Sequence, residues 1–231
     1  MSGTLPHEAT ASVYQLKVGL CACSPLIWRR LLVTSDTTIA QLHTILQTAL
    51  GWEDVHLHRF RVHGKEYGLY REGGLSFADD PHQVHLAEFQ LRPGERFVYE
   101  YDLIDFWQHD IRLEHILTWD LRKTYPVCIA GARACPLEDC GGPAGYQRLL
   151  EARESWEALE QMHADVLLVG QRLLAFYDGG PRPTFEDTEF MDALERMRER
   201  ETHTPIPFQR RRVNTALRQL RKESLCNSAS K

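Results

Sequence analysis

The spacing of apolar side chains in the first 62 residues restricts the fold more than any other feature of this sequence. Residues 13–20 (VYQLKVGL) and 27–33 (IWRRLLV) have the pattern of strands, and Ser24 and Pro25 between them favour a turn. Apolar residues then recur at helical spacing from 39 to 50, with Ser35 or Asp36 as the expected cap and Gly51 as the stop. A further strand at 56–62 (HLHRFRV) completes the order strand, strand, helix, strand, which is a β-grasp-like (β-β-α-β) opening.

The remaining pattern predicts an α+β fold with a mostly antiparallel sheet of about five strands, covered by helices. Residues 97–103 (FVYEYDL) and 109–117 (HDIRLEHIL) supply two more strands. Residues 128–145 are rich in Gly, Pro and Cys, which is typical of a loop. Helices are expected at about 146–159, 185–198 and 208–222, so the C-terminal part is helical.

Breaks in composition predict how the chain is divided. We expect a core domain over residues 12–178, because a Gly- and Pro-rich break follows at 179–183. A helical appendage is expected over 179–223 and a frayed tail over 224–231. The first eleven residues lack a basic start followed by a long apolar run, and the apolar stretch near 166–169 is too short to cross a bilayer. The expected location is therefore the cytoplasm, without membrane attachment.

Charge is concentrated toward the C-terminus. Residues 196–231 contain ten Lys or Arg against three Glu, a balance of +7, so residues 1–195 carry −12 within the total of −5. Six cysteines in 231 residues are too few for the disulfide framework of a small secreted domain, so reduced thiols or a metal site are expected.

Four ordered segments resemble one known family. They are residues 25–33 (PLIWRRLLV), 42–60 (LHTILQTALGWEDVHLHRF), 99–109 (YEYDLIDFWQH) and 128–152 (CIAGARACPLEDCGGPAGYQRLLEA). Together they are similar to the plasmid pRiA4b ORF-3-like family, whose members include insertion-element passenger proteins of the TnpR type. The resemblance covers about residues 13–152 and returns at Val213 and Asn214 in a closing helix. It implies a shared α+β fold and a link to mobile elements, and no established activity.

Two motifs depart from the pattern of that family. The family usually reads YxYDFGDxWxH, and this chain has Leu103 and Ile104 in place of the Phe-Gly pair. A glycine at this position permits a tight turn, so its replacement by Ile104 suggests that the loop has a different geometry from that of the family. The family also usually reads PPED where this chain has Leu137 after Pro136.

Histidines and carboxylates in these segments suggest two interpretations. A metal-dependent hydrolase or nuclease is one hypothesis, because imidazoles and carboxylates ligate divalent metals and serve in acid–base chemistry. In the alternative, the acids cap turns and pair with Arg29 or Arg30, while the histidines fill a half-buried sheet face. The candidates are His56, His58, Asp102, Asp105, His109 and Glu138.

The cysteine-rich loop offers a different metal site. Cys128, Cys135 and Cys140 with His109 could hold a structural divalent ion such as zinc, although the spacing lacks a CxxC knuckle. Buried free thiols are the alternative.

The basic C-terminal helix is the leading candidate for function. A cluster of cations there would neutralise phosphates of DNA with little sequence preference. In the alternative, these side chains pair with the acidic body of the same protein. We therefore expect a non-enzymatic accessory or binding protein that contacts nucleic acid, with a protein-binding adaptor that presents a sheet edge as a further alternative. The cations are Arg210, Arg211, Arg212, Arg218, Arg221 and Lys222.

Overall fold

The computed structural model describes residues 12–69, 76–202 and 204–229, and it divides the chain into two compact units. The first unit combines the residues up to 138 with those from 206 onward, and the second comprises 139–205. The boundary expected at residue 178 lies inside the second unit. The division therefore differs from the core of 12–178 and the appendage of 179–223 that composition suggested.

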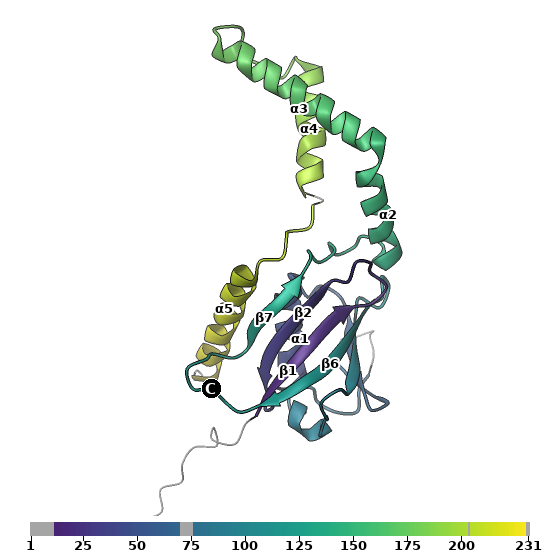
Figure 1. Ribbon diagram of the computed structural model, residues 1–231, viewed down its shortest axis with the longest axis vertical. Coiled ribbons are helices and arrows are strands. Elements are labelled where there is room, and N and C mark those ends of the chain that lie inside the picture. Colours follow the sequence, from purple (N-terminus) through teal and green to yellow (C-terminus); the bar gives the residue numbers. More distant parts are fainter. Residues whose placement is uncertain (1–11, 70–75, 203, 230–231) are drawn as a thin grey trace, which may run out of the picture. The chain divides into compact units, whose positions relative to one another are not determined.

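The first unit is built on an antiparallel sheet whose strand order is β4-β3-β5-β6-β1-β2-β7 (Figure 1). This confirms the α+β class, but the sheet has seven strands instead of about five. The two additional strands are β4, which has only three residues, and β7, which lies in a segment whose glycines and cysteines predicted a loop. The strands are β1 (Val13–Leu20), β2 (Trp28–Thr34), β3 (His58–Val62), β4 (Lys65–Tyr67), β5 (Arg96–Tyr101), β6 (Trp107–Leu117) and β7 (Val127–Ala132).

The helix α1 (Ile39–Leu50) follows β2 and precedes β3, in the predicted order. Its cap is Thr38 instead of Ser35 or Asp36, because the Thr38 hydroxyl accepts from the Gln41 amide while the Gln41 side chain accepts from the Thr38 amide. Gly51 ends the helix in the left-handed conformation, with φ at 91°.

The two faces of the sheet differ in polarity. The face toward α1 is apolar and includes Leu16, Phe60 and Trp107, which are fully buried. The opposite face carries ion pairs between strands, such as Arg30 of β2 with Glu114 of β6 at 2.6 Å, across the intervening strand β1. A sheet with one apolar face buries that face under a helix, so α1 lies behind the sheet in Figure 1.

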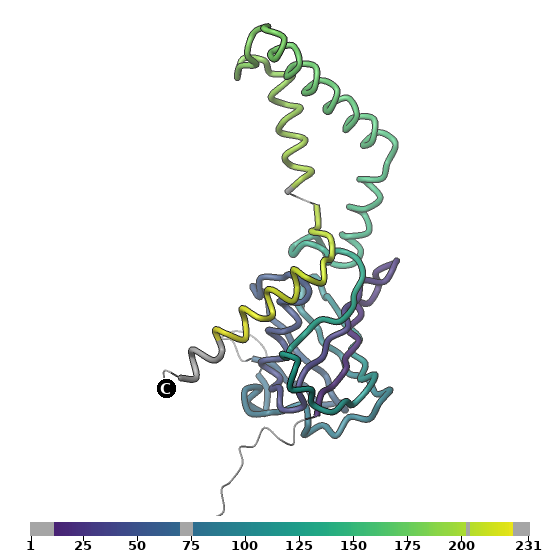
Figure 2. Tube along the Cα trace, turned by 60° about the vertical axis from the view of Figure 1, so that its left-hand side comes forward, coloured from purple at the N-terminus to yellow at the C-terminus, as the bar shows by residue number. Residues whose placement is uncertain are grey.

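Helix α5 (Arg210–Ala229) belongs to the first unit and packs beside α1 and the edge strand β7 (Figure 2). It extends to residue 229, into the segment 224–231 that was expected to be frayed. A short 3₁₀ helix, Leu86–Phe89, precedes β5.

The second unit is helical and consists of α2 (Gly142–Glu154), α3 (Trp156–Tyr177) and α4 (Thr188–Thr202). The expected helix at 146–159 is interrupted at Ser155, whose hydroxyl caps α3 by accepting from the Ala158 amide. Val169 of α3 packs with Phe190 and Ala193 of α4. No helix within the described residues is both long enough and apolar enough to cross a membrane.

Candidate functional site

One face of α5 is fixed to the body of the first unit. Leu217 is completely buried, and the Asn214 side chain makes two hydrogen bonds with the backbone of Cys128 in β7. The Cys128 amide donates to Asn214 Oδ1 at 2.7 Å, and Asn214 Nδ2 donates to the Cys128 carbonyl at 2.9 Å. This pairing satisfies edge-strand backbone groups that would otherwise need water, and it fixes the rotation of α5.

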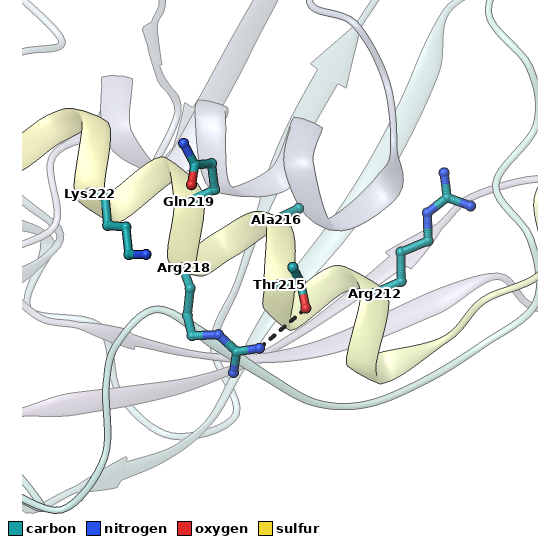
Figure 3. A pocket seen from close by; sticks show the side chains of 6 residues that line it. All are labelled: Arg212, Thr215, Ala216, Arg218, Gln219 and Lys222. Carbon is teal, nitrogen blue, oxygen red and sulfur yellow. Dashed lines mark hydrogen bonds between the residues drawn. The ribbon is translucent and has the colours of Figure 1, made fainter.

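The opposite side of α5 carries what we call the basic face, formed by Arg211, Arg212, Arg218 and Lys222. All four side chains are exposed. Figure 3 shows Arg212, Arg218 and Lys222 around a depression that Thr215 also lines, with a hydrogen bond of 3.2 Å from Arg218 to the Thr215 hydroxyl. Within the described part of the chain, no ion pair joins any of these four cations to an acid.

The other two predicted cations of this segment have different surroundings. Arg210 donates to the carbonyl of Ile129 at 3.2 Å, so it helps to attach the start of α5 to β7. Arg221 lines a second pocket together with Leu220, Tyr125 and residues of β2 and α1. Of the six predicted cations, four therefore lie on the basic face, and two lie next to the other elements of the first unit.

The predicted histidine and carboxylate residues are placed in several separate groups. His58, at the start of β3, is buried under α1, where its ring stacks on that of His43 with centroids 3.4 Å apart. His43 Nε2 lies 2.8 Å from Asp54 Oδ1, and His43 Nδ1 lies 2.8 Å from the Tyr99 hydroxyl. His43 and Asp54 were absent from the sequence-based candidates.

His56 and Asp102 form a second group, with His56 Nε2 at 3.7 Å from Asp102 Oδ2. Asp102 also caps a turn, because its Oδ1 accepts from the amides of Ile104 at 3.0 Å and Asp105 at 3.2 Å. The left-handed residues of this turn are Asp102 and Phe106, with φ at 55° and 58°. Position 104 does not adopt that conformation, so the glycine of the family pattern is not needed there.

His109 and Glu138 take part in other hydrogen bonds. The His109 ring is fully buried, its Nδ1 lies 3.3 Å from the Tyr99 carbonyl, and burial lowers its pKa from 6.5 to about 4. Glu138 accepts from the Tyr101 hydroxyl and, at 2.8 Å, from the Glu53 amide. Burial and the adjacent Glu138 carboxylate raise the pKa of Tyr101.

The predicted arginine partners of these acids have other roles. Arg29 is buried and donates to the backbone carbonyls of Ala49 and Ala132, while the Phe208 ring stacks on its guanidinium at 4.4 Å. Arg30 pairs with Glu114 on the outer face of the sheet and lowers the pKa of that carboxyl to about 2. Within the described residues, the hydrogen-bond partners of Arg29 and Arg30 are backbone carbonyls and Glu114, which are not the acids that the alternative interpretation assigned to them.

The cysteines of the predicted zinc site lie in different elements. Cys128 is buried in β7, where its thiol donates to the Ala130 carbonyl at 3.3 Å and burial raises its pKa. Cys135 is also buried, and Cys140 belongs to the second unit. In the parts of the chain that the structure describes, no cysteine belongs to a close group of three potential metal ligands. Cys128 therefore behaves as a small apolar residue of the sheet.

Comparison with known proteins places this α+β chain in one family. The family model described as plasmid pRiA4b ORF-3-like protein matches residues 12–178, and the chain belongs to that family. An uncharacterised protein, y4hQ of Sinorhizobium fredii, is 34% identical over 158 residues, which cover 68% of this chain and 80% of the relative. The crystal structure of MM3350, a protein of unknown function from Methanosarcina mazei, is 34% identical with a TM-score of 0.58, covering 65% of this chain and 86% of the other.

Proposed function

We propose that this protein is an accessory protein that binds nucleic acid through the basic face of α5, without base-specific contacts. The observation that carries the proposal is the exposure of Arg211, Arg212, Arg218 and Lys222 without an acidic partner in the described part of the chain. If these cations served mainly to pair with the acidic body of the same protein, acidic side chains would lie beside them. Unpaired exposed cations on one helix face instead offer a surface for phosphates.

The geometry of the helix supports contact with one stretch of backbone. From Arg211 to Lys222 the helix rises about 16 Å, at 1.5 Å per residue. This length matches about five steps of a duplex at 3.4 Å each. Four phosphate contacts predict that the logarithm of the binding constant falls with the logarithm of salt concentration with a slope of about −3 to −4 for duplex DNA.

The charge of the rest of the chain limits where a nucleic acid can lie. Residues 1–195 carry a formal −12, so their summed field repels phosphates. Contact is therefore confined to the neighbourhood of α5, and the affinity is modest. An accessory role in a mobile element, which the resemblance to insertion-element passenger proteins implies, fits binding that is tolerant of sequence.

Fluorescence anisotropy with labelled duplex and single-stranded DNA, measured over a series of salt concentrations, tests the proposal. The variant R212A/R218A removes two cations from the basic face, and alanine preserves the helix. The matched control R92A/R112A removes two exposed arginines elsewhere in the first unit. R212A/R218A should weaken binding and reduce the steepness of the salt slope by about 2, whereas the control should retain most of the wild-type slope. Absence of binding at low salt, or equal effects of the two variants, would refute the proposal.

A further inference from the structure

Three potential metal ligands from three different elements meet beneath α1. His43 comes from α1, Asp54 from the loop that follows it, and His58 from the start of β3. Each can offer a ligand atom, and these three atoms all lie within 4.8 Å of one another. We propose that His43, Asp54 and His58 bind a divalent transition-metal ion, for which zinc is the best fit.

The chemistry of the donor set supports this choice of ion. Two neutral imidazoles and one carboxylate form the kind of ligand set that binds zinc with a fourth position left for water. Hard ions such as Mg²⁺ and Ca²⁺ prefer oxygen ligands, so a set with two nitrogens disfavours them. The Asp54 side chain is 40% exposed while the His43 side chain is 1% exposed. An ion can therefore reach the buried imidazoles past Asp54.

Residues behind His43 form a second layer of hydrogen bonds. Tyr99, which is fully buried, places its hydroxyl 2.8 Å from His43 Nδ1 and 2.8 Å from Gln47 Nε2. With the protons in this arrangement, Gln47 donates to Tyr99, Tyr99 donates to His43 Nδ1, and His43 Nε2 donates to Asp54. Gln47 Oε1 is then a buried acceptor without a hydrogen bond.

A second arrangement of protons suits a bound ion. The two ends of an amide side chain are interchangeable in position, so Gln47 can turn its oxygen toward Tyr99. His43 Nδ1 then donates to the Tyr99 hydroxyl, which donates to Gln47 Oε1, and the lone pair of His43 Nε2 is available to a metal. Metal-binding histidines commonly donate their other ring N–H to such a partner, which fixes the tautomer and orients the ring.

The stacking of the two histidine rings shows what must move. The rings are nearly parallel, with an angle of 8° between their planes, so their in-plane lone pairs do not converge on one point. Binding requires the rings to turn so that both nitrogens face a common position near Asp54. The loop residue Asp54, which has a φ of 58°, can follow this movement more easily than a residue within a strand or helix.

Cobalt is a suitable probe because its visible absorption reports coordination. Tag-free full-length protein, treated with a chelator and dialysed, would be titrated with Co²⁺ and then with Zn²⁺. The expected result is one equivalent of Co²⁺ with the strong visible bands of four or five ligands, displaced by Zn²⁺. Strong near-ultraviolet bands from a thiolate on cobalt should be absent, which separates this site from one made by cysteines.

Asp54→Asn is the decisive variant, because asparagine keeps the size of the side chain and its amide oxygen can still accept from His43 Nε2. It should weaken Co²⁺ binding by at least about 10-fold, since a carboxylate ligand becomes neutral. Glu53→Gln removes the neighbouring exposed carboxylate as the matched control and should change affinity by less than about 2-fold. Thermal melts with and without Zn²⁺ check folding, and only the wild type and the control should gain stability from the ion. Lack of stoichiometric binding, or similar affinities of Asp54→Asn and Glu53→Gln, would overturn the assignment.

Discussion

Stability of the first unit should fall in mild acid because of one buried histidine. His109 is completely buried, and within the described residues its Nε2 has no hydrogen-bond acceptor to receive a second proton. Its pKa is lowered from 6.5 to about 4 because burial disfavours the charged ring. The folded protein therefore keeps the ring neutral over a pH range in which the unfolded chain protonates it.

The sign and size of the effect follow from the two pKa values. Between about pH 6.5 and pH 4 the unfolded state binds one more proton than the folded state, so the free energy of unfolding decreases as pH falls. A difference of about 2.5 pKa units corresponds to about 3 kcal/mol, at 1.36 kcal/mol per unit. Above pH 6.5 the contribution is constant, and below pH 4 both states carry the proton.

The test is to measure the free energy of unfolding in urea over this pH range for the wild type and for His109→Gln. The difference between the two proteins isolates the contribution of His109, because carboxylates that titrate in the same range are present in both. The glutamine side chain keeps a donor near the Tyr99 carbonyl and has no ionisable ring. The difference in unfolding free energy between the two proteins should shift by about 3 kcal/mol in favour of the variant between pH 7 and pH 4. His115→Gln, at an exposed position of the same strand, should keep the wild-type slope. Parallel curves for wild type and His109→Gln would refute the reasoning.

Two further predictions concern contacts of the sheet. Asn214→Ala leaves the amide and carbonyl of Cys128 without their side-chain partner. It should therefore lower the free energy of unfolding in urea titrations by about 1 to 3 kcal/mol. The control Thr215→Ala, on the exposed side of α5, should have little effect. Arg30 lowers the pKa of Glu114 from 4.5 to about 2. The pairing therefore contributes its full stabilisation at pH values above 4.5, and this contribution is lost as the pH falls toward 2. Glu114→Gln should therefore flatten the acid limb of the stability curve in that range, and an unchanged limb would contradict this explanation.

Local periodicity was sufficient to predict the elements whose side chains alternate or recur regularly. The strands β1 and β2 and the helix α1 have such patterns, and the structure contains them in the predicted order. The strand β7 was missed because its sequence, VCIAGA, has the small residues of a loop, and its extended form depends on pairing with β2. Pairing of that kind joins residues about 100 positions apart and leaves little local signal.

The candidate metal site shows the same limit at the level of single residues. His58 was found because two histidines in a strand are conspicuous, whereas His43 was overlooked within the apolar stripe of α1 between Leu42 and Leu46. A polar residue inside such a stripe is a usable signal, since a buried imidazole needs partners. Its partner Tyr99 could not be identified from the sequence, because their contact depends on how α1 lies on β5.

The positions of α1 and α5 argue against a single nuclease site that joins the two proposals. His43 and Gln47 project from α1 toward Tyr99 of the sheet, whereas Thr44 of the same helix lines a pocket with Arg221 of α5. The full width of α1, about 10 Å with its side chains, therefore separates the proposed ion from α5. A metal that cleaves a phosphodiester must contact the phosphate or its attacking water. DNA held on the basic face lies beyond that reach, so loss of the ion through Asp54→Asn should leave DNA affinity unchanged.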